Sequence, residues 1–128
     1  KYMEKVRELG VHEQSYILAG VGPLKSPGMA KYMKNKVPGI LVPDDVIDRM
    51  NEAGKEWAGK KTADLSPEEK KARSKAWREE GIQVCIDIIK GVKEIEGVAG
   101  VHIMAIEWEE AVKPIVEGAG LYPRPEVK

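Results

Sequence analysis

Three side chains that can bind, transfer protons or stack on rings lie close together in residues 100–108, GVHIMAIEW. His102 falls inside an apolar stretch, where we expect a structural imidazole bonded to a neighbouring strand or helix rather than a catalytic one. Glu107 could bind an amine of a substrate, and it could equally cap a following helix. Trp108 could offer its ring to a ligand or pack against the fold. The sequence leaves both alternatives open for Glu107 and for Trp108.

A second loop with polar side chains, GVGPLKSPG at residues 20–28, follows another apolar stretch. Lys25 and Ser26 could contact a substrate or a phosphate, although an exposed lysine is commonly only solvated. The loop lacks the G-x-G-x-x-G pattern, which disfavours a dinucleotide-binding fold. The two histidines are far apart and Cys85 is the single cysteine, so we expect no metal site and a buried, unreactive thiol.

The charge balance excludes several classes of partner. Lys plus Arg and Asp plus Glu both number 21, which gives a formal net charge of zero. Without an overall basic field, we expect neither nucleic acid nor an anionic membrane as a partner. No apolar run approaches the roughly 20 residues of a membrane span, and no signal-peptide pattern opens the sequence. We therefore expect a soluble, cytoplasmic protein.

Two apolar strands, at about residues 15–21 and 99–106, must position these side chains. Both read as strands buried on both faces, and the helical patterns between them imply parallel pairing. Two strands do not make a covered parallel sheet, so the pattern calls for further strands. Lys1 opens the chain and Met3 lies inside a helical pattern, so we interpret residues 1–128 as a piece of a longer protein.

The helices have recognisable ends. Ser26 is the expected N-cap of a helix that continues with Pro27, and SPEE at residues 66–69 combines a capping serine, a proline and a reciprocal glutamate. The second half of that long helix carries a core-facing stripe, and Gly81 is expected to bend or divide it. Pro114 is expected to kink or shorten the last helix.

Two longer stretches resemble the methylenetetrahydrofolate reductase family. The first is YILAGVGPLKSPGMAKYM, and the second is GIQVCIDIIKGVKEIEGVAGVHIMAI. They resemble the seventh strand with its following loop, and the helix with the last strand, of that family's flavin-dependent (β/α)8 barrel. The resemblance runs from about Tyr16 to Leu121, and it covers about the last quarter of a barrel of about 250 residues.

The resemblance implies that the chain is the C-terminal portion of an α/β TIM barrel, with its last strands and helices, and that the barrel is incomplete in these residues. It implies a flavoprotein oxidoreductase of one-carbon metabolism that uses FAD and reduces methylenetetrahydrofolate, or a related methylene-tetrahydropterin, to the methyl form. The flavin contacts and catalytic residues are expected on other strands, so the chain alone is expected to be inactive and to need another subunit or a homo-oligomer. The implied substrate-binding residues are Lys25, Ser26, Pro27, Met104, Glu107 and Trp108.

The sequence departs from the family at both strand ends. Pro27 stands where many members carry an aromatic residue, and HIMAIEW replaces a pattern that ends in asparagine and arginine. Glu107 and Trp108 take those last two positions, which weakens the expectation of a polyglutamate tail on the substrate. The alternative function is a non-catalytic α/β interaction module, or a split-barrel subunit, derived from such a reductase.

Overall fold

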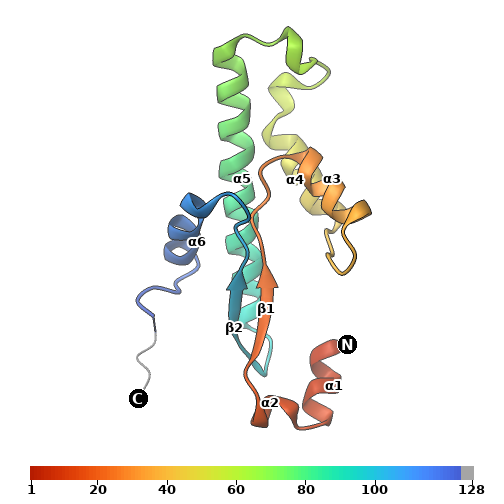
Figure 1. Cartoon of the computed structure of the whole chain (residues 1–128), viewed down its shortest axis with the longest axis vertical. Helices are drawn as coiled ribbons and strands as arrows, with labels where there is room; N and C mark the ends of the chain where they lie inside the picture. Colours follow the sequence, from red (N-terminus) through yellow and green to blue (C-terminus); the bar gives the residue numbers. More distant parts are fainter. Residues whose placement is uncertain (125–128) are drawn as a thin grey trace. The chain divides into compact units, whose positions relative to one another are not determined.

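The computed structural model describes residues 1–124, which form two compact units. The first unit combines residues 1–23 with the residues from Cys85 onward, and the second unit is Leu24–Val84. The long helix α5 (Pro67–Lys93) contributes residues to both (Figure 1). Among the described residues, no helix has the length and apolar character needed to cross a lipid bilayer.

The first unit is built around a parallel pair of strands (Figure 1). Ile17 pairs with Val98 and Val21 pairs with Ile103. Gly10 has φ +67°, a left-handed conformation that suits glycine and separates the two helices before the first strand. The elements are α1 (Tyr2–Glu8), α2 (Val11–Gln14), β1 (Ile17–Val21), the end of α5, β2 (Val98–Ile103), the 3-10 turn η3 (Glu109–Ala111) and α6 (Val112–Gly118).

One face of this sheet is open. Leu18 and Gly20 alternate along β1 with covered residues, and the Leu18 side chain is 57% exposed, whereas Val21 on the other face is buried. The expectation of a first strand buried on both faces is therefore wrong. The core of this unit contains Ile89 and Ile115, which are fully buried. Gly118 of α6 packs closely in it, because a Cβ added there would lie 2.5 Å from Ile86 Cδ1.

The prediction of a portion of a (β/α)8 barrel is also wrong. Residues 1–124 contain six α-helices and a single two-stranded parallel sheet, so helix dominates the fold. The predicted parallel pairing is confirmed, because the alternation of strand and helix indicates it. The same pattern carries no information on how many strands the sheet contains. The two strands are also shorter than expected, Ile17–Val21 and Val98–Ile103.

The second unit is helical. It contains α3 (Pro27–Lys36), α4 (Asp44–Ala53), the 3-10 turns η1 (Lys55–Trp57) and η2 (Thr62–Asp64), and the first part of α5. The partly buried Met29 and Met33 pack against its core. That core consists of Leu24, Ala30, Val42, Val46, Ile47, Met50 and Val84.

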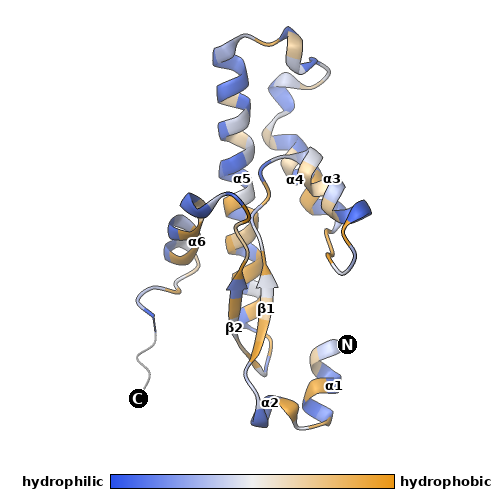
Figure 2. Cartoon of the chain, in the orientation of Figure 1, coloured by the Kyte–Doolittle hydropathy of each residue, from blue (hydrophilic) through white to orange (hydrophobic). Residues whose placement is uncertain are grey.

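Helix α5 begins as predicted and runs as one helix through Gly81 to Lys93. Ser66 Oγ accepts a hydrogen bond from Glu69 N at 3.1 Å, and Ser66 N donates to a Glu69 carboxylate oxygen at 2.9 Å. This reciprocal pair is the capping box that SPEE indicates. The expected division at Gly81 is therefore wrong. Figure 2 shows the hydrophilic first half of α5 giving way to a more hydrophobic second half.

The last helix differs from its prediction for a simple reason. Pro114 is the third residue of α6, which starts at Val112 and runs on to Gly118. The first turn of a helix has amide groups without intrahelical acceptors, so a proline there removes no hydrogen bond. The expected kink or early end at Pro114 is therefore wrong.

Candidate functional site

Parallel pairing brings the ends of β1 and β2 together at one edge of the sheet. Gly20 pairs with His102 and Val21 with Ile103. The backbone contact continues beyond the strands, because Met104 N donates a hydrogen bond to Val21 O at 2.7 Å. The segment after β1 and the segment after β2 therefore lie side by side, as expected for the carboxyl ends of adjacent parallel strands.

Two glycines allow this close approach. A Cβ added at Gly22 would lie 2.9 Å from the carbonyl oxygen of Met104, and one added at Gly20 would lie 3.1 Å from Met104 Cε. A side chain at either position would push the two segments apart. The run ILAGVG carries glycine at alternate positions of one face, a signal that sequence reasoning overlooked at Gly20.

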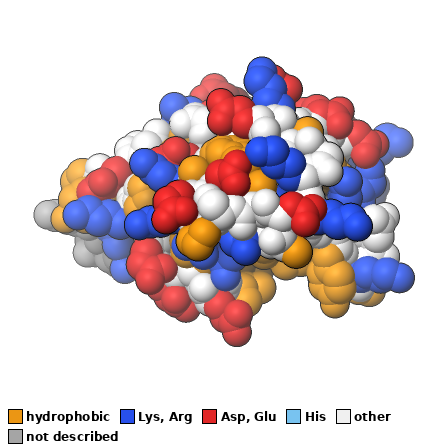
Figure 3. Space-filling view, turned by 90° about the horizontal axis from the view of Figure 1, so that it is seen from above, with side chains coloured by type: hydrophobic (Ala, Val, Ile, Leu, Met, Phe, Trp, Pro, Cys, Tyr) orange, Lys and Arg blue, Asp and Glu red, His pale blue; other side chains and the backbone are white. Residues whose placement is uncertain are grey.

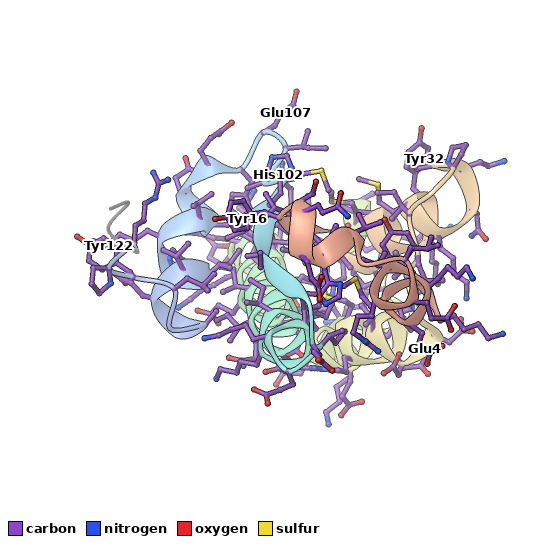
Figure 4. All side chains as sticks on the ribbon, turned by 90° about the horizontal axis from the view of Figure 1, so that it is seen from below. Glu4, Tyr16, Tyr32, His102, Glu107 and Tyr122 are labelled. Atoms are coloured by element: carbon purple, nitrogen blue, oxygen red, sulfur yellow. The ribbon has the colours of Figure 1, made fainter. Side chains whose placement is uncertain are left out.

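A strained turn follows Met104. Trp108 N donates to Ala105 O at 3.0 Å, and Glu107 within this turn has φ +52°. This left-handed conformation costs a residue with a Cβ about 1–2 kcal/mol. The turn presents the exposed Glu107 side chain outward, as Figure 4 shows. The carboxylate can accept hydrogen bonds from the N–H groups of a ligand.

The structure bears on the alternatives for Glu107 and Trp108. Trp108, not Glu107, is the N-cap residue of η3, and among the described residues no side-chain hydrogen bond caps this turn or α6. Trp108 is only 6% exposed, which favours packing over a ring platform for a ligand. Met104 and Ile106 are instead the apolar side chains exposed beside the strand ends.

His102 lies on the open face of the sheet. Its side chain is exposed and its partner in the register is Gly20, which leaves room above the strand. Its imidazole makes no hydrogen bond within residues 1–124, so the expected bond to a neighbouring strand or helix is not formed there.

Lys25, Ser26 and Pro27 belong to the second unit, whereas Met104, Glu107 and Trp108 belong to the first. Ser26 is the N-cap of α3, as predicted, and its Oγ accepts a hydrogen bond from Met29 N at 3.2 Å. Pro27 is buried as the first residue of that helix. The structure therefore brings together the three residues after β2 and gives the other three a role at the start of α3.

The grooves of the two units do not suit FAD. A groove of about 540 Å³ in the second unit is lined by Asp45, Asp48, Glu52 and Glu80, whose carboxylates would repel a diphosphate, with Arg49 bound to Glu80 at 2.8 Å. The groove of about 220 Å³ beside β2 is smaller than the roughly 300–1,000 Å³ typical of ligand pockets. Residues 1–124 contain no cluster of three potential metal ligands.

Cys85 is not a reactive centre in this arrangement. It is fully buried in the first unit, and burial raises the pKa of its thiol to about 11. The thiolate is the nucleophilic form, so the side chain behaves as a small apolar group at neutral pH.

Comparison with known proteins adds no relative: no family model, curated protein or solved structure matches the chain.

Proposed function

We propose that this chain forms part of a flavin-dependent oxidoreductase that reduces methylenetetrahydrofolate, or a related methylene-tetrahydropterin, to the methyl form. The proposal begins from the two stretches that resemble the reductase family. One observation carries it further: each stretch contains one strand of the parallel pair, and the two strands end at the same edge, where Met104 N donates a hydrogen bond to Val21 O at 2.7 Å. This edge is where ligands of α/β proteins commonly bind.

Under this proposal, the segment 104–107 contributes to the pterin site. The Glu107 carboxylate would accept hydrogen bonds from the amino group and a ring N–H of the pterin, since an ionised carboxylate is a pure acceptor with two oxygens. Met104 and Ile106 would supply apolar contacts to the ring. Trp108 would support the turn from within the core, which replaces the stacking role considered for it.

The proposal assigns FAD binding and the hydride chemistry to another part of the protein or to another subunit, because neither groove of the described residues suits the cofactor. The flavin would supply the hydride, and this chain would help to orient the pterin. The proposal includes a further subunit or a second copy, and it places the reaction in the cytoplasm. The single cysteine, which leaves no disulfide framework within the chain, is compatible with that compartment.

Calorimetric titration of the chain with methyltetrahydrofolate tests this proposal. We expect weak binding, with a Kd of about 1 mM, or about −4 kcal/mol, because only part of the site is present. Glu107→Gln should weaken it about tenfold, as expected for a lost hydrogen bond to a charged group. Glu117→Gln, the same chemical change at an exposed glutamate of α6, serves as the matched control and should bind normally.

A non-catalytic interaction module is the second candidate. The open face of the sheet favours it, because Leu18 is 57% exposed and Tyr16 beside it is also exposed. Parallel sheets are normally covered on both faces, so this surface suits another protein. Absence of methyltetrahydrofolate binding in the titration would favour this candidate over the reductase.

A further inference from the structure

Strand β2 has one edge without a partner in the described part of the chain. β1 pairs with β2 on one side, and the described residues add no third strand to this sheet (Figure 1). Met104 N donates a hydrogen bond to Val21 O, so His102, two residues earlier, also directs its backbone groups toward β1. The N–H and C=O groups of Val101 and Ile103 therefore face the free edge. Such an edge can form hydrogen bonds with a further strand.

A groove of about 220 Å³ lies along this edge. Four consecutive residues of β2, 98–101, line it together with Val92, Lys93 and Leu121. Successive side chains of a strand point to opposite faces of the sheet, so a groove that touches all four residues runs beside the backbone. The register of the pair skips Ala99, so this residue has no partner on β1. The whole groove belongs to the first unit.

The groove offers apolar walls and one positive charge. Val92 and Leu121 supply the apolar side chains beside the strand. Among the described residues that line the groove, Lys93 alone is charged, and its Nζ donates a hydrogen bond to Ala119 O at 3.4 Å. An ammonium group has three N–H donors, so Lys93 can bind a carboxylate as well. The groove therefore suits an extended chain that carries apolar side chains and an acidic one.

Recognition at this groove has to be local, because the chain lacks an overall charge. Its formal net charge is zero, and Figure 3 shows Lys and Arg mixed with Asp and Glu over the face it displays. A neutral chain does not attract a charged partner over long distances. Backbone hydrogen bonds at the strand edge and the ammonium group of Lys93 are then the features that select a partner.

We propose that the free edge of β2 binds an extended segment of another protein as a third strand of the sheet. The segment carries apolar side chains at alternate positions, which pack on Val92 and Leu121, and an acidic side chain that pairs with Lys93. Its backbone exchanges hydrogen bonds with Val101 and Ile103, a mode of recognition known as β-strand addition. The groove shares no residue with the segment 104–107, so this binding does not depend on the proposed reductase function.

Amide hydrogen exchange of the full chain, with and without synthetic peptides, tests the proposal. Each peptide alternates valine with threonine and contains one glutamate, whose position varies across the set. We expect the Val101 and Ile103 amides to exchange about tenfold more slowly when a peptide is bound, because they gain hydrogen-bond acceptors. The His102 amide faces β1 already, so it should change little and serves as the internal control.

Modified peptides and a pair of variants distinguish strand addition from non-specific contact. Methylation of the peptide amides that face β2 should weaken binding about tenfold, whereas methylation of the alternate amides should not. Lys93→Gln should weaken binding about threefold, as expected for an exposed ion pair. Lys90→Gln, at an exposed position of the same helix, is the matched control and should bind normally. The methylated peptides need no change in the protein, so they decide the matter even if Lys93→Gln is unfolded.

Unchanged exchange rates at millimolar concentrations of every peptide in the set would overturn the proposal. Equal weakening by both patterns of methylation would also overturn it, since binding would then not use the strand edge. Exchange at Val101 and Ile103 that slows with rising protein concentration, without peptide, would show that a second copy occupies the edge and would replace the proposed partner.

Discussion

Replacement of Gly81 by alanine should destabilise the protein, against the usual preference for alanine in helices. Gly81 lies inside α5, and a Cβ there would be 1.8 Å from the carbonyl oxygen of Leu24 and 2.9 Å from its carbonyl carbon. Both are backbone atoms, so a rotamer change does not relieve the overlap. Either the helix or the segment at Leu24 has to move, which disturbs the core that contains Leu24 and Val84.

The size of the effect follows from two opposing terms. Alanine in place of a helical glycine contributes about 1 kcal/mol of stability. Overpacking typically costs about 1–3 kcal/mol, and an overlap of backbone atoms belongs at the upper end or beyond. We therefore expect Gly81→Ala to lower the free energy of unfolding by about 2 kcal/mol.

Urea denaturation followed by circular dichroism measures this change, and the same helix offers a matched control. Gly91 is also in α5, but a Cβ there would meet no heavy atom within 4 Å. Gly91→Ala should therefore raise the free energy of unfolding by about 0.5–1 kcal/mol. A Gly81→Ala variant as stable as the unmodified chain would refute the contact between α5 and the backbone of Leu24.

Three further predictions concern single side chains. Glu107→Gly should relieve the left-handed strain at φ +52° and change the unfolding free energy by no more than about 1 kcal/mol, measured in urea, whereas Glu107→Val should be destabilising. The Cys85 thiol, with a pKa of about 11, should react with a thiol reagent at pH 8 only after unfolding; rapid labelling of the folded chain would contradict its burial. The hydrogen bond from Ser66 N and the contact with Lys60 lower the pKa of Glu69 below its ordinary value. Its contribution to stability is therefore present above that ordinary value and is lost as the pH falls through the lower folded value, so thermal melts of Glu69→Gln should show a weaker acid dependence than those of the unmodified chain.

The features that the sequence predicted correctly depend on local interactions. The SPEE start of α5 requires only hydrogen bonds between Ser66 and Glu69, and the N-cap of α3 requires only Ser26 and Met29. These contacts span three residues, so a short sequence pattern contains all the information needed. The parallel pairing of the two strands also followed from the alternation of strands and helices.

The predictions that were wrong concern features that depend on distant residues or on a residue's position within a helix. The apolar character of LAGVG does not tell whether another layer covers Leu18, and here none of the described residues does. The barrel expectation failed for the same reason. Pro114 was misjudged because its effect depends on its distance from the start of α6.

In the candidate site too, the features set by local sequence were predictable and those set by distant residues were not. The placement of residues 104–108 directly after a strand could be predicted, because it depends on sequence order alone. The burial of Trp108 could not, since it depends on how the chain folds back over its indole. The strained conformation of Glu107 carried no sequence signal either, because glycine or asparagine is the usual residue at such a position.

Mapping the binding of methyltetrahydrofolate onto the chain by two-dimensional NMR tests the central claim most directly, because amide shifts report weak binding residue by residue. The proposed function predicts shifts concentrated at Gly22 and at residues 103–108, saturating as the ligand is added. Unchanged spectra at millimolar ligand, or shifts confined to residues far from the strand ends, would contradict a pterin site at this edge of the sheet.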